Sequence, residues 1–312
     1  MSESGRSTPT RMRAALLTVL IVTGISLTAC SRTALDDSAG DTRSSISPRI
    51  AQPMRIAYGD SPDNYGILHL PDGPGPHPVV VMIHGGGWQQ DHDLTYFEPL
   101  ARSLADEGVA VWNIEYRRVG GAGGWPTTPA DANDATEALS TVVRDAAPGY
   151  LDLDRVHLAG HSAGGHLAAW VSGRHRLPPE SPGQQPRIRA RSATIMAGVF
   201  DLPLAATAGN DKFVRNLLGG FPREFPDRYR IASPIDNLPI GLPVTAIHGD
   251  ADRTVDPVQS RNYVNAAKAA GDSAQLRILD GVGHGDFGRV DSPAWATAKQ
   301  VILDHVAADN VR

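Results

Sequence analysis

The sequence predicts an α/β fold in which a mostly parallel, doubly wound sheet carries helices on both faces. Short apolar runs alternate with segments of helical periodicity along most of the chain, and this alternation is typical of βαβ units. Residues 79–83 are apolar throughout, as expected of a strand buried on both faces of a parallel sheet. In 155–171, a strand-like run leads through a glycine-rich turn into a helix-like run.

The individual elements follow from the same periodicities. Strands at 54–58 and 65–70, joined by a turn, form a plausible antiparallel edge. Further strands are expected at 79–83, 109–116, 155–159, 193–199, 244–248 and 275–279, and helices at 97–107, 132–144, 163–171, 260–270 and 294–308. Residues 201–235 interrupt the alternation with one or two expected helices. We interpret them as a small cap over the site, with an unrelated surface excursion as the alternative.

Charge and composition narrow the function classes. The chain of 312 residues has a net charge of −5 and no cluster of Lys and Arg. Nucleic-acid binding needs clustered cationic side chains to contact phosphates. We therefore expect no nucleic-acid partner.

The N-terminus predicts export. A basic stretch ends at Arg13 and is followed by an apolar run from 14 to 27, too short for a comfortable membrane span. Cys30, the only cysteine, follows the run in Leu27-Thr28-Ala29-Cys30, a context that resembles a bacterial lipobox. The expected domains are a lipoprotein signal peptide at 1–29, a lipid-anchored flexible tether at 30–53 and a catalytic domain at 54–312. An ordinary secretory signal and an uncleaved anchor helix are the alternatives.

Ser162 lies in the pattern G-x-S-x-G between an expected strand and an expected helix. A sharp strand-to-helix turn exposes such a serine and brings neighbouring backbone into contact, which requires small residues on both sides. Taken alone, the pattern could arise by chance in a glycine-rich chain. As a nucleophile, a serine needs a nearby base and a group that orients that base.

The sequence after Ser162 supplies both groups. His284 lies between glycines after one expected strand, and Asp250, Asp252 and Asp256 follow another. Aspartates in such a loop can also accept backbone N–H bonds, so all three remain candidates at this point. His161 is expected to point away across the turn, and we interpret it and His166 as packing residues.

Residues 84–87 read HGGG and follow a buried strand upstream of the serine. Backbone N–H groups fixed in advance can stabilise the negative charge of an acyl-transfer transition state. We assign this role to Gly86, Gly87 and, at the start of the helix after the serine, Ala163. The chain lacks G-x-x-x-x-G-K-[ST] and a G-x-G-x-x-G that opens a helix, so nucleotide-binding interpretations are weak.

The body from about residue 54 resembles α/β-hydrolases of the hormone-sensitive-lipase-like esterase group, and is most similar to bifunctional feruloyl and acetyl-xylan esterases. The resemblance rests on HGGGW at 84–88, EYR at 115–117, Pro126 with Asp131, GHSAGG at 160–165, ASP at 232–234, HGDAD at 248–252 and GHG at 283–285. It implies an α/β-hydrolase fold and a triad of Ser162, His284 and Asp252, because in related hydrolases the acid follows His-Gly-x-x. Asp131 is expected to cap a helix. The segment 201–235 matches no pattern of the family.

The expected activity is hydrolysis of carboxylic esters, with short acyl chains or acylated carbohydrate, through an acyl-enzyme. No cofactor and no metal site are expected. An amidase or peptidase with the same triad and a non-catalytic binding protein on this fold are the alternatives. Localisation is expected on the outer side of the bacterial cytoplasmic membrane or in the cell envelope, through a lipid at Cys30. A cytoplasmic enzyme with a different N-terminal role is the remaining alternative.

Overall fold

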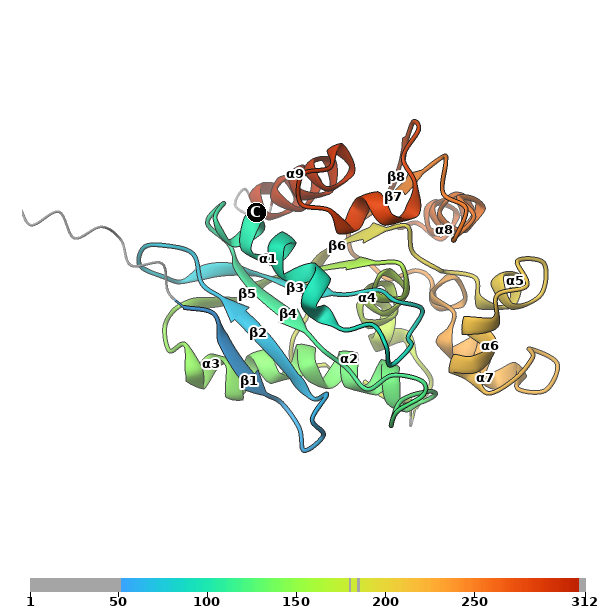
Figure 1. Ribbon diagram of the computed structural model, residues 1–312, viewed down its shortest axis with the longest axis horizontal. Coiled ribbons are helices and arrows are strands. Elements are labelled where there is room, and N and C mark those ends of the chain that lie inside the picture. The colour runs from blue at the N-terminus through green and yellow to red at the C-terminus, as the bar shows by residue number, and fades with distance from the viewer. Residues whose placement is uncertain (1–51, 180, 184–185, 309–312) are drawn as a thin grey trace, which may run out of the picture. The chain divides into compact units, whose positions relative to one another are not determined.

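An eight-stranded sheet forms the centre of the part of the chain that the structure describes (Figure 1). This computed structural model describes residues 52–179, 181–183 and 186–308, which all belong to one unit, Ile46–Arg312. The strands are β1 (Met54–Ala57), β2 (Tyr65–His69), β3 (His77–Ile83), β4 (Ala110–Ile114), β5 (Leu151–His161), β6 (Ala190–Met196), β7 (Val244–Gly249) and β8 (Ala274–Leu279). Their order is β1-β2-β4-β3-β5-β6-β7-β8. Only the pairs that involve β2 are antiparallel among the described strands.

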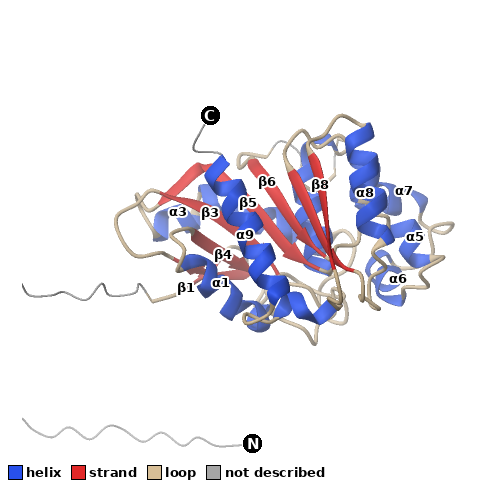
Figure 2. Cartoon of the chain, turned by 90° about the horizontal axis from the view of Figure 1, so that it is seen from above, coloured by secondary structure: helices blue, strands red, loops and turns tan. Residues whose placement is uncertain are grey.

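Helices cover both faces of the sheet. The α-helices are α1 (Glu98–Ala105), α2 (Thr127–Glu137), α3 (Val142–Ala146), α4 (Ala163–Gly173), α5 (Leu202–Ala206), α6 (Lys212–Leu218), α7 (Pro226–Ala232), α8 (Val258–Ala269) and α9 (Pro293–Ala308). One core cluster joins α1 and α9 to the sheet, and the other joins α2, α3, α4 and α8 to its opposite face. Figure 2 shows α1 and α9 together in front of the strands. The doubly wound architecture expected from the sequence is confirmed.

The predicted helix at 132–144 is wrong in its bounds. The structure has α2 at Thr127–Glu137, then a short 3-10 segment, then α3 at Val142–Ala146. Pro129 lies in the first turn of α2, where backbone N–H groups have no partner within the helix, so a proline is tolerated there. The chain is interrupted at Thr141, whose φ and ψ of −133° and −106° are not helical.

The sheet topology brings distant segments together. After β3 the chain forms β4 on one side of β3, and then β5 on the other side. Such a switch in strand order is where α/β sheets bind ligands, at the carboxyl ends of the strands. Ile83 at the end of β3 pairs with Gly160 near the end of β5. The HGGG segment and Ser162 therefore leave the sheet side by side.

The predicted signal peptide, the tether up to residue 51 and Cys30 lie outside the described residues. Within the described ranges, no helix is long and apolar enough to cross a membrane. β1 begins at Met54.

Candidate active site

Ser162 occupies a strained turn between β5 and α4. Its φ is 57° and its ψ is −122°, a backbone conformation that L-residues rarely adopt. A β-carbon on Gly160 would lie 2.2 Å from the carbonyl oxygen of Gly164, and one on Gly164 would lie 2.0 Å from that of Ile83. The two glycines of the G-x-S-x-G pattern are therefore required by close backbone contact on both sides of the serine.

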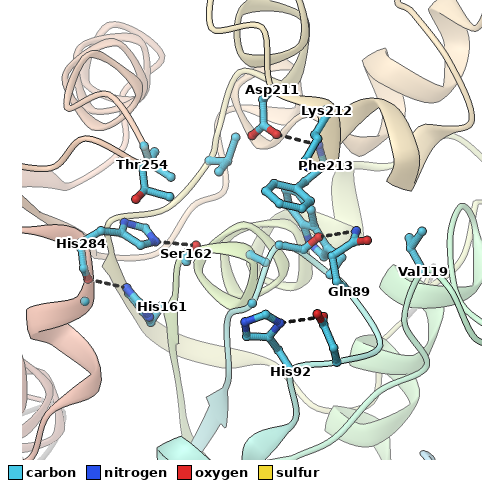
Figure 3. A pocket seen from close by; sticks show the side chains of 18 of the residues that line it. Gln89, His92, Val119, His161, Ser162, Asp211, Lys212, Phe213, Thr254 and His284 are labelled. Atoms are coloured by element: carbon cyan, nitrogen blue, oxygen red, sulfur yellow. Dashed lines mark hydrogen bonds and ion pairs between the residues drawn. The ribbon is translucent and has the colours of Figure 1, made fainter.

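The structure brings Ser162, His284 and Asp252 into one line of hydrogen bonds, of which Figure 3 shows the bond between Ser162 and His284. The Ser162 Oγ lies 2.8 Å from His284 Nε2, and His284 Nδ1 lies 2.7 Å from Asp252 Oδ2. Because a carboxylate only accepts, Nδ1–H donates to Asp252, and Nε2 is left to accept from the serine hydroxyl. The His284 side chain is 15 % exposed and that of Asp252 is 0 % exposed. The line thus runs from a buried carboxylate to a serine that lines a cavity.

Several donors fix the Asp252 carboxylate. Its Oδ1 accepts the backbone N–H groups of Thr254 and Val255 at 2.8 and 2.9 Å, while its Oδ2 lies 3.2 Å from Nε2 of His248. Burial alone would raise the pKa of Asp252, but the hydrogen bonds from His248, His284 and Val255 outweigh it and lower the pKa. The acid is therefore ionised at neutral pH, as required of a group that orients an imidazole.

The other two aspartates of this loop bind backbone instead. Asp250 Oδ1 accepts the N–H of Gly281 at 2.7 Å, and Asp256 Oδ1 accepts that of Val258 at 2.9 Å. No role was predicted from the sequence for His248, which lies next to last in β7 and four residues before Asp252. Its Nδ1 lies 2.7 Å from the Ser260 hydroxyl, so its Nε2 faces Asp252.

The HGGG segment presents backbone N–H groups beside Ser162. Gly86 and Gly87 have φ values of 103° and 60°, which favour glycine. Across the described residues, no hydrogen bond takes up the N–H of Gly86 or Gly87, and both glycines line a cavity with Ser162 and Ala163. These N–H groups can therefore stabilise an oxyanion at the serine.

Buried polar side chains hold the HGGG segment in place. The His84 ring stacks on Tyr116, and its Nε2 lies 2.9 Å from Glu115 Oε1. Arg118 lies 3.0 Å from the same carboxylate oxygen, and the Tyr116 hydroxyl donates to the His84 carbonyl at 2.9 Å. In the sequence, Glu115 and Tyr116 belong to the EYR segment that supports the family resemblance, but their role in holding the HGGG segment was not predicted.

His161 differs from the expectation that it points away across the turn. Its Nε2 lies 3.0 Å from the His284 carbonyl oxygen, and its Nδ1 lies 3.2 Å from the Tyr96 hydroxyl. Figure 3 shows it beneath His284. Burial, and then the proximity of His284, lower the pKa of His161 to about 3. It is a neutral, buried residue that supports the His284 loop.

Asp131 is not the helix cap expected from the sequence. It lies inside α2, is 1 % exposed, and accepts from the backbone N–H and the guanidinium of Arg117 at 2.6–2.9 Å. The N-cap position is Pro126, which makes no side-chain cap. Asp131 instead fixes the chain that follows β4.

The sequence model of the BD-FAE family matches residues 67–266. The chain belongs to the BD-FAE family. This family consists of esterases with the α/β-hydrolase fold, so the resemblance found in the sequence is confirmed. The matched residues contain Ser162 and Asp252 and end before His284.

This BD-FAE chain is 26% identical over 247 residues to isoprenylcysteine α-carbonyl methylesterase ICME of Arabidopsis thaliana, covering 74% of the chain and 56% of that protein. It is 28% identical over 249 residues to esterase LipC of Mycobacterium tuberculosis, covering 76% and 60%. The chain thus spans less than two thirds of the length of these curated relatives.

Solved structures share the fold. Esterase 2 of Thermogutta terrifontis has a TM-score of 0.67 and 25% identity, covering 84% of this BD-FAE chain and 94% of that chain. One structure of that esterase has propionate bound. A truncated carbohydrate esterase from gut microbiota has a TM-score of 0.68 at 22% identity, covering 81% and 95%.

A cavity of about 1110 Å³ opens above Ser162 in this BD-FAE chain. Segment 201–235, in which α5, α6 and α7 lie, supplies one wall through Gly209, Asn210, Asp211, Lys212 and Phe213. The Phe213 ring lies against Gly87. A β-carbon added to Gly87 would be only 3.2 Å from the ring. Gln89, His92 and Val119 also line the cavity (Figure 3). The segment interpreted as a cap therefore borders the cavity that contains the serine.

Proposed function

We propose that this chain is a serine esterase that cleaves short-chain carboxylic esters, including acylated carbohydrate, through a covalent acyl-enzyme. The observation that carries the proposal is the hydrogen-bonded line from Ser162 through His284 to Asp252, with the free N–H groups of Gly86 and Gly87 at its open end. Nucleophile, base, orienting acid and oxyanion donors are the four parts that acyl transfer requires.

In the first half of the reaction, the Ser162 Oγ attacks the ester carbonyl carbon while its proton moves to His284 Nε2. The carbonyl oxygen becomes an oxyanion, which accepts from the N–H groups of Gly86, Gly87 and Ala163. Asp252 holds Nδ1–H and stabilises the imidazolium that forms. When the tetrahedral intermediate collapses, the C–O bond to the alcohol breaks and Nε2 returns the proton to the leaving oxygen.

In the second half, water replaces the alcohol. His284 Nε2 takes a proton from a water molecule that attacks the acyl carbon, and the same N–H groups hold the second oxyanion. Collapse releases the carboxylic acid and returns the proton to Ser162. Every step uses side chains and backbone of this chain.

Two features support a short acyl group. The Phe213 ring lies against Gly87, so there is little space for a long acyl chain beside the oxyanion donors. The T. terrifontis esterase, 25% identical, binds propionate. Polar groups from Gln89, Asn210 and Asp211 line the remaining space, which suits a polar alcohol such as a sugar.

A nitrophenyl ester series from acetate to laurate, with a matched nitroanilide, tests the substrate class. Short esters should be hydrolysed fastest, Ser162→Ala should be inactive, and Ser140→Ala, a serine outside the cavity, should match the native protein. Equal rates across all chain lengths would contradict the acyl preference. Faster cleavage of the amide would favour an amidase or peptidase with the same triad.

We also propose that the protein is exported and anchored to the bacterial envelope through a lipid on Cys30, with 1–29 removed and 30–53 as tether. The proposal rests on the basic stretch, the short apolar run and the single cysteine at its end. In a bacterial host, the native chain should fractionate with membranes and Cys30→Ser should not. A membrane fraction unchanged by Cys30→Ser would contradict lipidation at this residue.

A further inference from the structure

One line of hydrogen bonds connects three loops of the site that are far apart in the sequence. The N–H of Gly85, after β3, donates to the Tyr96 hydroxyl at 2.6 Å. The Tyr96 hydroxyl lies 3.2 Å from Nδ1 of His161, at the end of β5, and His161 Nε2 lies 3.0 Å from the carbonyl oxygen of His284, after β8. The line thus joins the loop of the oxyanion donors, the serine turn and the loop of the base.

The two ends of this line fix the direction of every hydrogen bond in it. The Gly85 N–H can only donate and the His284 carbonyl can only accept. His161 therefore carries its proton on Nε2, which leaves Nδ1 as an acceptor for the Tyr96 O–H. All donors and acceptors along the line are satisfied in this single arrangement.

The arrangement requires a neutral His161. A protonated imidazole would turn Nδ1 into a donor and break the bond from Tyr96. The pKa of His161 is lowered to about 3 by burial and by the proximity of His284, so the ring stays neutral over the range in which esterases act. The ring centroids of His161 and His284 are 4.7 Å apart. His161 thus packs beside the base as a neutral ring.

Tyr96 makes a second contact with the base loop. His284 begins a short 3-10 helix that ends at Gly288, and a β-carbon on Gly288 would lie 3.2 Å from the Tyr96 ring. Tyr96 is therefore held between Gly85 and the helix that carries the base. A β-carbon on Gly85 would likewise lie 3.0 Å from the Tyr96 hydroxyl and 2.9 Å from Ser162 Cβ.

We propose that Tyr96 and His161 are a positioning pair that fixes the His284 backbone relative to the Gly85–Gly87 loop, so that base and oxyanion donors keep their distances from Ser162 during the reaction. The inference rests on the proposed esterase function. The pair acts through His284 and Gly85, so its loss should lower the rate of the chemical step more than substrate binding.

The test compares Tyr96→Phe, His161→Leu, the double variant and His161→Gln with the native protein. A fluorophosphonate titration counts active serines, so kcat is expressed per active site and is not affected by a misfolded fraction. Tyr263→Phe is the matched control, because Tyr263 is buried and its hydroxyl has no hydrogen-bond partner within the described residues.

We expect Tyr96→Phe and His161→Leu each to lower kcat per active site about tenfold or more, with KM changed less than about threefold. The double variant should be about as slow as the slower single variant, because both remove one line. His161→Gln should stay within about threefold of the native rate, since an amide can donate to His284 and accept from Tyr96. Tyr263→Phe should be unchanged.

Native rates per active site in Tyr96→Phe and His161→Leu would overturn the positioning role, and so would effects that multiply in the double variant. If His161→Leu does not fold, Tyr96→Phe alone decides, since it removes only a hydroxyl. A native protein that neither hydrolyses esters nor reacts with the fluorophosphonate would instead overturn the proposed function, so the two failures are distinguishable.

Discussion

At the scale of single residues, hydrogen bonds separate three aspartates that follow β7. Asp252 faces His284 at 2.7 Å, while Asp250 and Asp256 accept backbone N–H groups of Gly281 and Val258. Residue spacing alone allowed all three to serve as the orienting acid, and only the family resemblance favoured Asp252. The direction in which a loop side chain points depends on contacts with β8 and α8, which local sequence does not encode.

Substitution of these aspartates tests the assignment. Asp252→Asn should lower kcat by about 10³–10⁴-fold, because the amide no longer stabilises the imidazolium or holds its tautomer. Asp250→Asn, the matched control in the same loop, should stay within about threefold of the native rate. Steady-state kinetics on a short nitrophenyl ester measures both. Similar losses of kcat in the two variants would show that activity depends on the conformation of the loop and not on the Asp252 carboxylate.

His161 and Tyr96 show where residue-level prediction fails. The sequence places His161 next to the serine, but the strained turn at Ser162 decides on which side each neighbour emerges. Tyr96 lies in a segment with no motif and reaches Gly85 and His161 only through the tertiary fold. Patterns that depend on close backbone contact, such as G-x-S-x-G and HGGG, were predictable because they constrain local geometry.

At the scale of elements, α4 carries a titratable group that the reaction does not use. His166 is 0 % exposed, and its Nε2–H donates to the Ala232 carbonyl at 2.9 Å. Burial lowers its pKa to about 4 from 6.5. The unfolded chain therefore binds a proton at higher pH than the folded chain does. The stability that neutral His166 contributes is fully present above pH 6.5 and is lost as the pH falls towards 4.

Urea unfolding at pH 7 and pH 5 measures this effect. The native protein should lose on the order of 2 kcal/mol more unfolding free energy between these pH values than His166→Gln, because the variant has no group to titrate at this position. Glutamine can still donate to Ala232, so both proteins should fold. An identical pH dependence of the two unfolding free energies would show that the pKa of His166 is the same in the folded and unfolded chain.

The helix α6 of the cap segment sets one wall of the cavity through Phe213. Asp211 caps this helix by accepting the N–H groups of Phe213 and Val214, and the Leu217 carbonyl accepts from Trp125 N–H at 2.8 Å. Val214, Leu217 and Leu218 are buried, whereas Phe213 is 36 % exposed. The sequence indicated helices here but not which side chain faces the site, because that depends on how α6 packs in the folded protein.

Phe213→Ala should widen the cavity beside Gly87. The ratio of kcat/KM for octanoate over butyrate nitrophenyl esters should rise by about tenfold, as expected when several methylene groups gain space. Phe221→Ala is the matched control, since Phe221 is similarly exposed at 39 % and is not part of the cavity lining. Equal ratios in the native protein and Phe213→Ala would show that another wall limits the acyl chain.

At the scale of the whole molecule, strand order explains why the site exists. The parallel pairing of β3 with β5 places the HGGG loop beside Ser162. The parallel pairs from β5 through β6 and β7 to β8 bring the Asp252 and His284 loops to the same edge of the sheet. The alternation of strands and helices was predictable because each element has a distinct hydrophobic period. The bounds of α2 were not predictable, because Pro129 in its first turn indicates the end of a helix when only the sequence is considered.

The central claim is that Ser162 is the nucleophile of a covalent mechanism, and intact-protein mass spectrometry after fluorophosphonate treatment tests it most directly. We predict one adduct per native chain, located by peptide mapping on Ser162, with parallel loss of ester hydrolysis. Ser162→Ala should form no adduct and retain less than about 10⁻³ of the native kcat. An adduct on another residue, or ester hydrolysis that survives in Ser162→Ala, would contradict the account.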